Sequence, residues 1–438
     1  MKKFSFGARG WLLVIWAFLC IAMASAIPST VQVAVGLFAQ KGFNSTLLLS
    51  LMTYGSWGTL VCLFILNFFT AKGKVSYRKL GLVIGILWAV FTALWGFVGA
   101  EWLFVVVYIL SFLCCQLMVL VVVNNTIANW FPTRKGTVIG LATMGFMLGA
   151  MAGVKLFGPM VVSLGNLGLV YVAFGAVIAI IVLFGFFALR DYPEECGCYP
   201  DNNREMTREQ ADAMFKAQME EAAKSPWTQG RVLGTWQVWF ISIACGIMLL
   251  FSSVLSSQLM VRLVAAGYEM NTAVNMFMAC CLIGCVGSWF IGWVDNRIGP
   301  KAAAIITMIA MIVACILTTL KSTPLMWIAL ALLGVELGGS SNFTTSLVVT
   351  YWGRQSFGKV YGVVVIIQQV IGAFGALFAS TTSAKWNYDV TYLIMAGMSV
   401  VAIILLIPLK KGFAEKKEAA WGVTPHTGNE IPPSSMEE

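Results

Sequence analysis

Charge is scarce in this sequence. Asp, Glu, Lys and Arg make up only 11% of its 438 residues, whereas 59% are hydrophobic. Soluble domains carry about 25% charged residues, so this chain lacks the polar groups to cover a water-facing surface of its size. The composition therefore excludes an ordinary soluble protein and points to a chain built for lipid.

Histidine is nearly absent, and this bears on catalysis. The single copy, His426, stands near the C-terminus, outside the apolar segments. A serine or cysteine nucleophile needs a neighbouring base, and no histidine base can be placed beside one within the apolar segments. We therefore expect no catalytic residue and no enzyme activity.

Cofactor and metal motifs are missing as well. The sequence has no Walker loop, so ATP cannot drive work through this chain, and we expect no cofactor. Cys196 and Cys198 share a loop, but no second Cys or His pair stands nearby, so we expect no metal. The net charge of +9 does not indicate a nucleic-acid partner, because the basic residues stand in short loops between apolar runs.

Long apolar runs dominate what is present. A bilayer core about 30 Å thick needs about 20 apolar residues per helix, and such runs recur from Trp11 to Leu409. They predict an all-α membrane protein with twelve transmembrane helices. The predicted helices are 11–36, 46–69, 79–98, 101–129, 136–160 and 167–189, followed by 236–264, 271–294, 301–320, 325–350, 357–383 and 389–409.

The runs divide the chain into four parts. Residues 1–189 form the predicted N-terminal six-helix half, and residues 235–409 form the C-terminal half. A polar central loop, 190–234, separates them, and a polar tail, 410–438, follows. Within the loop, residues 207–223 predict an amphipathic helix that begins with a capping box.

The two halves resemble each other at a constant offset of 222 residues, at which Trp130 corresponds to Trp352 and Lys79 to Lys301. Such a repeat is typical of transporters with duplicated halves, so we expect two pseudo-symmetric six-helix halves. The fifth helix also carries Gly145, Gly149 and Gly153 at intervals of four residues. This spacing predicts a small-residue face on which a neighbouring helix packs closely.

The basic residues predict the orientation. Most Lys and Arg residues fall in loops on the side that holds both termini, whereas the loops on the other side contain only Lys41, Lys321 and Lys385. Positive charge is retained on the cytoplasmic side of a membrane. We therefore expect a multi-pass protein of the plasma membrane, or of the inner membrane in a bacterium, with both termini in the cytoplasm.

One loop carries a family resemblance. Residues 292–301 read Gly-Trp-Val-Asp-Asn-Arg-Ile-Gly-Pro-Lys, which resembles the Gly-x-x-x-Asp-x-x-Gly-x-Arg/Lys loop of the major facilitator superfamily. A carboxylate at a helix end can meet a helix N-terminus and loop cations, forming a latch that breaks when the two halves move. The first-half equivalent, 71–79, keeps the cations but lacks the carboxylate. The expected latch residues are Gly292, Asp295, Arg297, Gly299 and Lys301.

A second resemblance concerns the substrate. Residues 129–136, Asn-Trp-Phe-Pro-Thr-Arg-Lys-Gly, resemble a loop of the oxalate/formate antiporter family and related monocarboxylate carriers, which implies transport of small organic anions. That family clamps a dicarboxylate with cations from helices eight and eleven. Here helix eight has no Arg or Lys, and helix eleven offers Gln368 and Gln369, so we do not expect oxalate itself.

Ionisable residues within the predicted helices are the main site candidates. Glu336 is the only acidic residue deep within a span, where burial disfavours the ionised form. It either couples transport to protons and binds substrate or is a neutral packing residue. Lys155 either attracts an anion or reaches for the headgroups, and Arg262 either contacts substrate or anchors at the interface. Polar residues on helices that line the family's cavity, each also explicable by packing, include Gln32, Tyr54, Gln258, Gln368 and Gln369.

Together these features predict a secondary active transporter that moves a small organic anion, a mono- or dicarboxylate, by alternating access, with exchange or proton coupling. Its expected partners are that small molecule and the lipid bilayer, and we expect a monomer. One alternative is a proton-coupled exporter of amphipathic or cationic compounds, in which Glu336 serves both proton and substrate. Another is a transport-like sensor whose central loop and tail bind a partner, with little flux.

Overall fold

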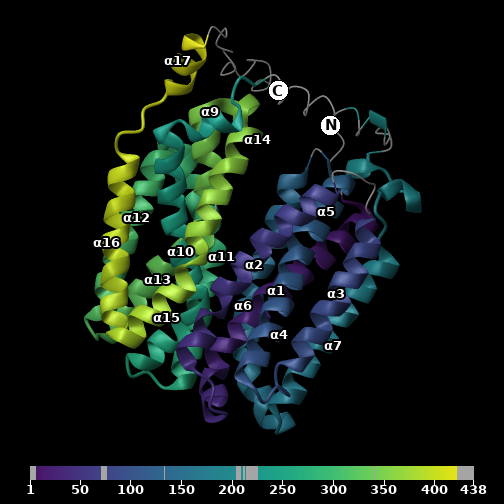
Figure 1. The fold of residues 1–438 in the computed structure, drawn as a ribbon, viewed down its shortest axis with the longest axis vertical. Helices are drawn as coiled ribbons and strands as arrows, with labels where there is room; N and C mark the ends of the chain where they lie inside the picture. The colour runs from purple at the N-terminus through teal and green to yellow at the C-terminus, as the bar shows by residue number, and fades with distance from the viewer. Residues whose placement is uncertain are drawn as a thin grey trace.

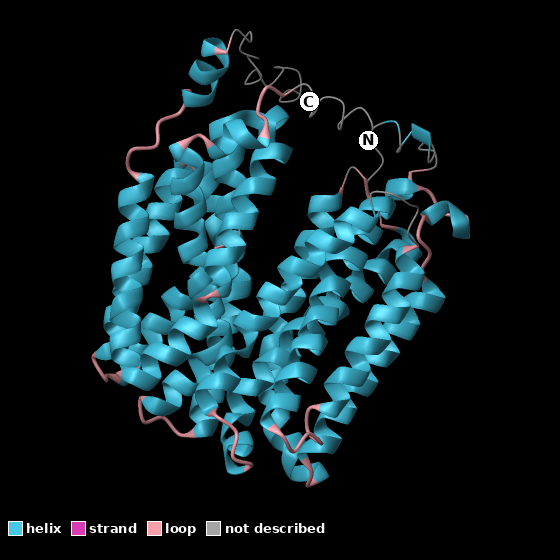
Figure 2. Cartoon of the chain, in the orientation of Figure 1, coloured by secondary structure: helices cyan, strands magenta, loops and turns pink. Residues whose placement is uncertain are grey.

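The computed structural model describes residues 6–70, 76–132, 134–203, 209–210, 213, 225–340 and 342–421. Within these ranges the chain is helical, with short connecting loops and no strand (Figure 2). Among the described residues, eleven helices are long and apolar enough to cross a membrane, and one bent pair of helices, taken as one span, makes twelve. The predicted class, an all-α membrane protein with twelve spans, is confirmed. Most of the expected loop helix, 207–223, lies outside the described residues.

The N-terminal half contains six spans. The fourth is continuous but includes a π-helical segment, η1, that the sequence analysis did not foresee. The spans are α1 (Gly7–Gln40), α2 (Ser45–Thr70), α3 (Tyr77–Leu94), the series α4 (Glu101–Leu117), η1 (Met118–Val123) and α5 (Asn124–Trp130), then α6 (Lys135–Leu164) and α7 (Leu167–Ala188).

The C-terminal half also contains six spans, of which two are interrupted. The tenth bends by 55° between α13 and the start of α14. In the eleventh, 356–385, Phe374 separates α14 from α15 without a sharp bend. The helices are α10 (Trp236–Ala265), α11 (Met270–Ile298), α12 (Pro300–Thr319), α13 (Thr323–Gly339), α14 (Asn342–Ala373), α15 (Gly375–Lys385) and α16 (Tyr388–Leu406). Short elements outside the spans are η2 (Pro193–Cys196), η3 (Pro200–Asn202), α9 (Gln229–Leu233) and α17 (Phe413–Ala420).

Local residue chemistry fixes where the spans begin and end. The side chain of Asn166 accepts a hydrogen bond from Gly168 N–H at 2.7 Å and caps α7, and Asn387 caps α16 by accepting from Val390 N–H at 2.9 Å. These bonds satisfy donors that a helix N-terminus leaves free. Gly299, at φ +85°, separates α11 from α12, a backbone conformation that favours glycine.

Glycines bring helices into close contact within each half. On α6, a Cβ added at Gly149 would lie 2.0 Å from the carbonyl oxygen of Ala22 on α1. In the C-terminal half, a Cβ at Gly338 on α13 would lie 1.8 Å from Gly284 O on α11. Both pairs of backbones therefore approach more closely than any side chain would allow, and the contact of α6 is the one that the glycine spacing of the fifth helix predicts.

The repeat is visible in equivalent contacts of the two halves. Arg78 Nε donates to Phe186 O at the end of α7 (2.6 Å), and Lys301 Nζ donates to Ile407 O after the end of α16 (2.6 Å). Each half thus uses a cation at the start of its third helix to satisfy carbonyls at the end of its sixth. This contact ties the third and sixth helices of each half together, at the outer edge of the bundle (Figure 1).

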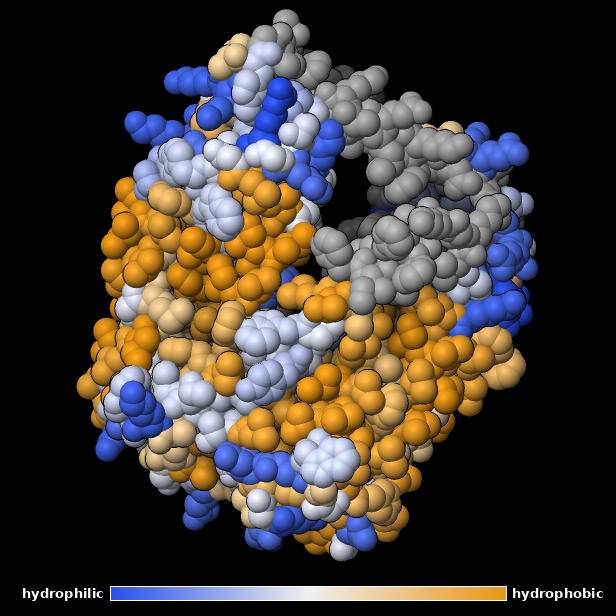
Figure 3. Space-filling view, viewed as in Figure 1, coloured by the Kyte–Doolittle hydropathy of each residue, from blue (hydrophilic) through white to orange (hydrophobic). Residues whose placement is uncertain are grey.

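The two halves meet over only part of their length. The terminal face is the end of the bundle where α1 begins and α17 lies, and the opposite face is the other end (Figure 1). The halves part towards the terminal face, where the space-filling view is hollowed between them (Figure 3). The hydrogen bonds that join α1, α2 and α6 to the C-terminal half use residues nearer the opposite face. The structure is therefore closed at the opposite face.

The end of the central loop packs against the start of the tail. Trp227 is fully buried and donates from Nε1 to Glu418 Oε1 of α17 at 2.6 Å. Its ring packs edge-to-face against Trp421 at 4.9 Å, and Lys359 Nζ of α14 donates to Ser225 O at 3.1 Å. Loop, tail and eleventh span are thus connected at the terminal face.

Candidate functional site

Glu336 lies inside the C-terminal half with no exposed surface. Its Oε1 accepts a hydrogen bond from Ser252 Oγ of α10 at 3.3 Å, and Ser252 Oγ lies 2.8 Å from Ser340 Oγ. Its Oε2 has no hydrogen-bond partner among the described residues, and no cation pairs with it there. An ionised carboxylate is costly under these conditions, so the site suits a carboxyl group that holds or exchanges a proton.

The helix geometry places Glu336 near the bend of the tenth span. Gly334 and Gly338 let α13 approach α11 closely, whereas Glu336, two residues from each glycine, bonds Ser252 on α10. Ser340 stands directly after α13, where the tenth span bends by 55°. The hydroxyl of Ser252, which is half-buried, therefore connects α10 to both the carboxyl group and the bend.

Lys155 lies at the boundary between the halves. It stands in the last third of α6, and its Nζ donates to Asn275 Oδ1 of α11 at 3.2 Å. Both residues are exposed. Because the amide of Asn275 is neutral, this bond leaves the charge of the ammonium uncompensated.

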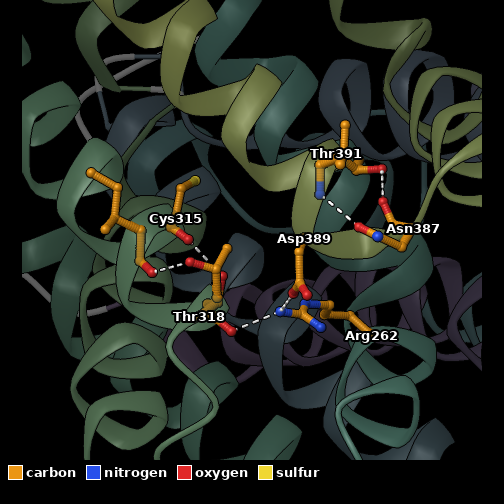
Figure 4. Close-up of polar contacts among 9 residues, drawn as sticks. Arg262, Cys315, Thr318, Asn387, Asp389 and Thr391 are labelled. Atoms are coloured by element: carbon orange, nitrogen blue, oxygen red, sulfur yellow. Dashed lines mark hydrogen bonds and ion pairs between the residues drawn. The ribbon is translucent and has the colours of Figure 1, made fainter.

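Arg262 has a different environment, within the C-terminal half (Figure 4). Its Nη2 lies 2.5 Å from Asp389 Oδ1 and donates to Thr318 O at 2.7 Å. Its guanidinium stands over the ring of Tyr392 at 5.5 Å. These contacts join α10, α12 and α16, so the structure assigns the charge of Arg262 to holding three helices together.

The glutamine candidates divide by environment. Gln258 is fully buried, donates to Ala376 O at 2.8 Å and accepts from Tyr388 Oη at 3.1 Å, all within the C-terminal half. Gln368 is buried and accepts from Thr344 Oγ1 at 2.6 Å. Gln369 is exposed. Gln258 is therefore bonded through both its amide nitrogen and its oxygen, Gln368 through its oxygen, and Gln369 presents an exposed amide.

Tyr54 lies close to the boundary between the halves. Its ring is edge-to-face with Trp57 on α2, at 6.3 Å between centroids. Trp57 in turn meets Phe374 of the broken eleventh span at 4.6 Å. Tyr54 thus belongs to an aromatic cluster across the boundary, whereas Glu336 and Arg262 lie inside one half.

The expected latch residues do not converge in this conformation. Asn296, not Asp295, stands four residues after Gly292, where the family motif has its carboxylate. A shift of one residue turns a side chain by about 100° around a helix. None of the ion pairs among the described residues involves Asp295, and Arg297 stacks on the ring of Trp293 at 4.3 Å. Lys301 is bonded to carbonyls after α16, so a latch formed by Asp295 remains a prediction.

Two further residues bridge the halves. Gln32 of α1 bonds main-chain groups of α10, and Thr53 of α2 accepts from Leu377 N–H of α15 at 3.0 Å. The sequence places Gln32 among polar candidates but gives it no partner, and nothing in it singles out Thr53. Main-chain partners leave no residue-type signal, which is why sequence analysis missed both contacts.

Known proteins were compared with this chain and its structure. A family model described as Major Facilitator Superfamily matches residues 14–376 and 287–429. The glucose-6-phosphate exchanger SLC37A2 of Xenopus laevis is 24% identical over 378 residues, which cover 76% of this chain and 73% of the exchanger. The family model and this relative do not confirm the oxalate/formate or monocarboxylate branch that residues 129–136 resemble.

Solved structures share the fold over nearly the whole chain. A bacterial homologue of the human lysosomal transporter Spinster, in an inward-facing and unoccupied conformation, has a TM-score of 0.63 at 16% identity and covers 92% of this chain and 96% of its own. The nucleoside transporter NupG has a TM-score of 0.66 at 12% identity, with 92% and 98% covered. At these identities the likeness concerns the fold alone.

Proposed function

Because the chain belongs to the Major Facilitator Superfamily, and is a multi-pass membrane transporter, we propose that it moves a small organic anion by alternating access between its two halves. The terminal face would be cytoplasmic, since most basic loop residues lie on that side. The conformation described here would then be open to the cytoplasm and closed to the outside. The proposed membrane is the plasma membrane, or the inner membrane of a bacterium.

Lys155 is the observation that carries the anion proposal. Its ammonium stands at the boundary between the halves, and its partner among the described residues is a neutral amide. An uncompensated cation on a transport path raises the local concentration of anions. The relative named as a glucose-6-phosphate exchanger handles an anion according to its name, which supports the same substrate class.

Glu336 supplies the proposed proton coupling. One carboxyl oxygen is bonded to Ser252 and the other has no partner among the described residues, so gain or loss of a proton would change the bonds beside the bend of the tenth span. A proton taken up there favours one arrangement of the span over the other. This is the differential interaction that coupling requires.

A ligand screen tests the substrate class. The purified protein is heated with carboxylates, sugar phosphates, nucleosides, sugars and cationic amphiphiles at two pH values, because a ligand that binds only the folded state raises its apparent stability. We expect stabilisation by one or more organic anions. Stabilisation by cations alone would contradict the proposal and favour the exporter.

Substitution of Lys155 tests the site. Uptake of the radiolabelled anion into proteoliposomes should fall at least about tenfold in Lys155→Ala, since loss of one charged hydrogen bond costs about 1.5–3 kcal/mol. The matched control is Lys385→Ala, which removes an exposed cation at the end of α15. Equal uptake by the two variants and the wild type would remove Lys155 from the site.

A further inference from the structure

We propose that Gln32 and Thr53 form the outer gate, and that the gate is held by hydrogen bonds to main-chain groups of the other half rather than by ion pairs. This inference rests on alternating access, as proposed above, but not on the identity of the substrate. It assigns roles to two residues that the family motifs do not mark.

The amide of Gln32 is matched to one turn of α10. Its Nε2 donates to Ser256 O at 3.1 Å, and its Oε1 accepts from Met260 N–H at 3.0 Å. Ser256 and Met260 are four residues apart, and in a regular α-helix this carbonyl and this N–H bond each other. Gln32 is 3% exposed, so the contact is shielded from water in the closed state.

This arrangement makes the gate reversible. When the halves separate at the opposite face, Ser256 O and Met260 N–H can return fully to their helical bond, so α10 is left with no unpaired group. Only the amide of Gln32 loses its partners, and it then faces the water that enters. Because both states satisfy the buried main-chain groups, neither state is penalised heavily.

Thr53 bonds the eleventh span, where α14 gives way to α15. The eleventh span breaks at Phe374, and α15 begins at Gly375, which makes Leu377 the third residue of the new helix. Its N–H is one of the donors that a helix N-terminus leaves free, and a capping side chain usually accepts from this position. Here Thr53 Oγ1 accepts that bond at 3.0 Å from the other half, so α15 is capped across the boundary.

Hydrogen exchange measured by mass spectrometry on the full-length protein in lipid nanodiscs tests the gate without any substrate. We expect Gln32→Leu to shift the population towards the outward-open state by about five- to thirtyfold, the effect of one or two kcal/mol. Peptides from the opposite-face ends of α1 and α10 should then exchange faster by that factor. Peptides at the terminal face should exchange more slowly, because that face closes.

Gln258→Leu is the matched control. It also removes a buried glutamine on a gate helix, but its bonds to Ala376 and Tyr388 stay within one half. It should speed exchange around α10, α15 and α16 without protecting the terminal face. Thr53→Val, which keeps the side-chain shape but loses the acceptor, should reproduce the Gln32→Leu pattern with a smaller shift.

The proposal fails if Gln32→Leu leaves exchange at the opposite face unchanged, or speeds it without protecting the terminal face, since local loosening alone gives that second pattern. The result is independent of the ligand screen. A screen without anion hits contradicts the proposed substrate, whereas these exchange patterns judge only the gate.

Discussion

Two buried ionisable side chains of the C-terminal half, Arg262 and Glu336, differ sharply in environment. Arg262 is paired with Asp389 and a carbonyl, whereas Glu336 has only a hydroxyl on one oxygen. The sequence marks both as ionisable residues within spans. The sequence cannot show that Arg262 is paired and that Glu336, among the described residues, is not. Asp389, the ionic partner of Arg262, is 127 residues further along the chain, and the second partner of Arg262, Thr318 O, is a main-chain oxygen.

Arg262→Ala should therefore affect stability. Removing the arginine leaves Asp389 unpaired, at a cost of about 2 kcal/mol, less than for a fully buried pair because Asp389 keeps 31% of its side-chain surface exposed. The melting temperature of the purified protein should fall, and Asp389→Asn in the same chain should restore part of it. A variant with normal melting temperature but no ligand-induced stabilisation would instead place Arg262 in the substrate site.

Helix packing is the scale at which the sequence was most informative. The glycine spacing of the fifth helix predicted a close approach, and α6 meets α1 through Gly149 and its neighbours. The π-helical η1 and the break at Phe374 were not predicted. The π-helical segment itself, Met118–Val123, is uniformly apolar, so its hydrophobic pattern does not indicate one extra residue in a turn.

Two glycines on α6 give a matched test of this packing. Gly149→Val should lower stability by at least about 3 kcal/mol, because the obstacle to its side chain is the main chain at Ala22 and cannot swing aside. Gly158→Ala should leave stability equal or raise it by about 1 kcal/mol, since no atom lies within 4 Å of its added Cβ. Thermal melting and size-exclusion profiles measure both, and similar profiles for the two variants would contradict the close approach.

At the scale of the whole molecule, the number of spans could be read from sequence because each span is a run of apolar residues such as 167–188. The conformation of the transporter could not be read from the sequence. Whether the pathway is open at one face depends on a few bonds between halves, such as those of Gln32 and Thr53, whose partners are main-chain groups. The substrate is similarly underdetermined, since the roles proposed for Lys155 and Glu336 concern charge and protonation and not the shape of the ligand.

The most direct test of the account is counterflow. Proteoliposomes loaded with an unlabelled organic anion from the ligand screen should transiently accumulate the labelled anion above its external concentration, and an imposed pH gradient should alter uptake by the wild type but not by Glu336→Gln, which cannot exchange a proton. Alternating access predicts this overshoot, because one half-cycle carries an anion out and the other half-cycle carries an anion in. An anion that binds and stabilises the protein but shows no counterflow would contradict the account and favour a sensor.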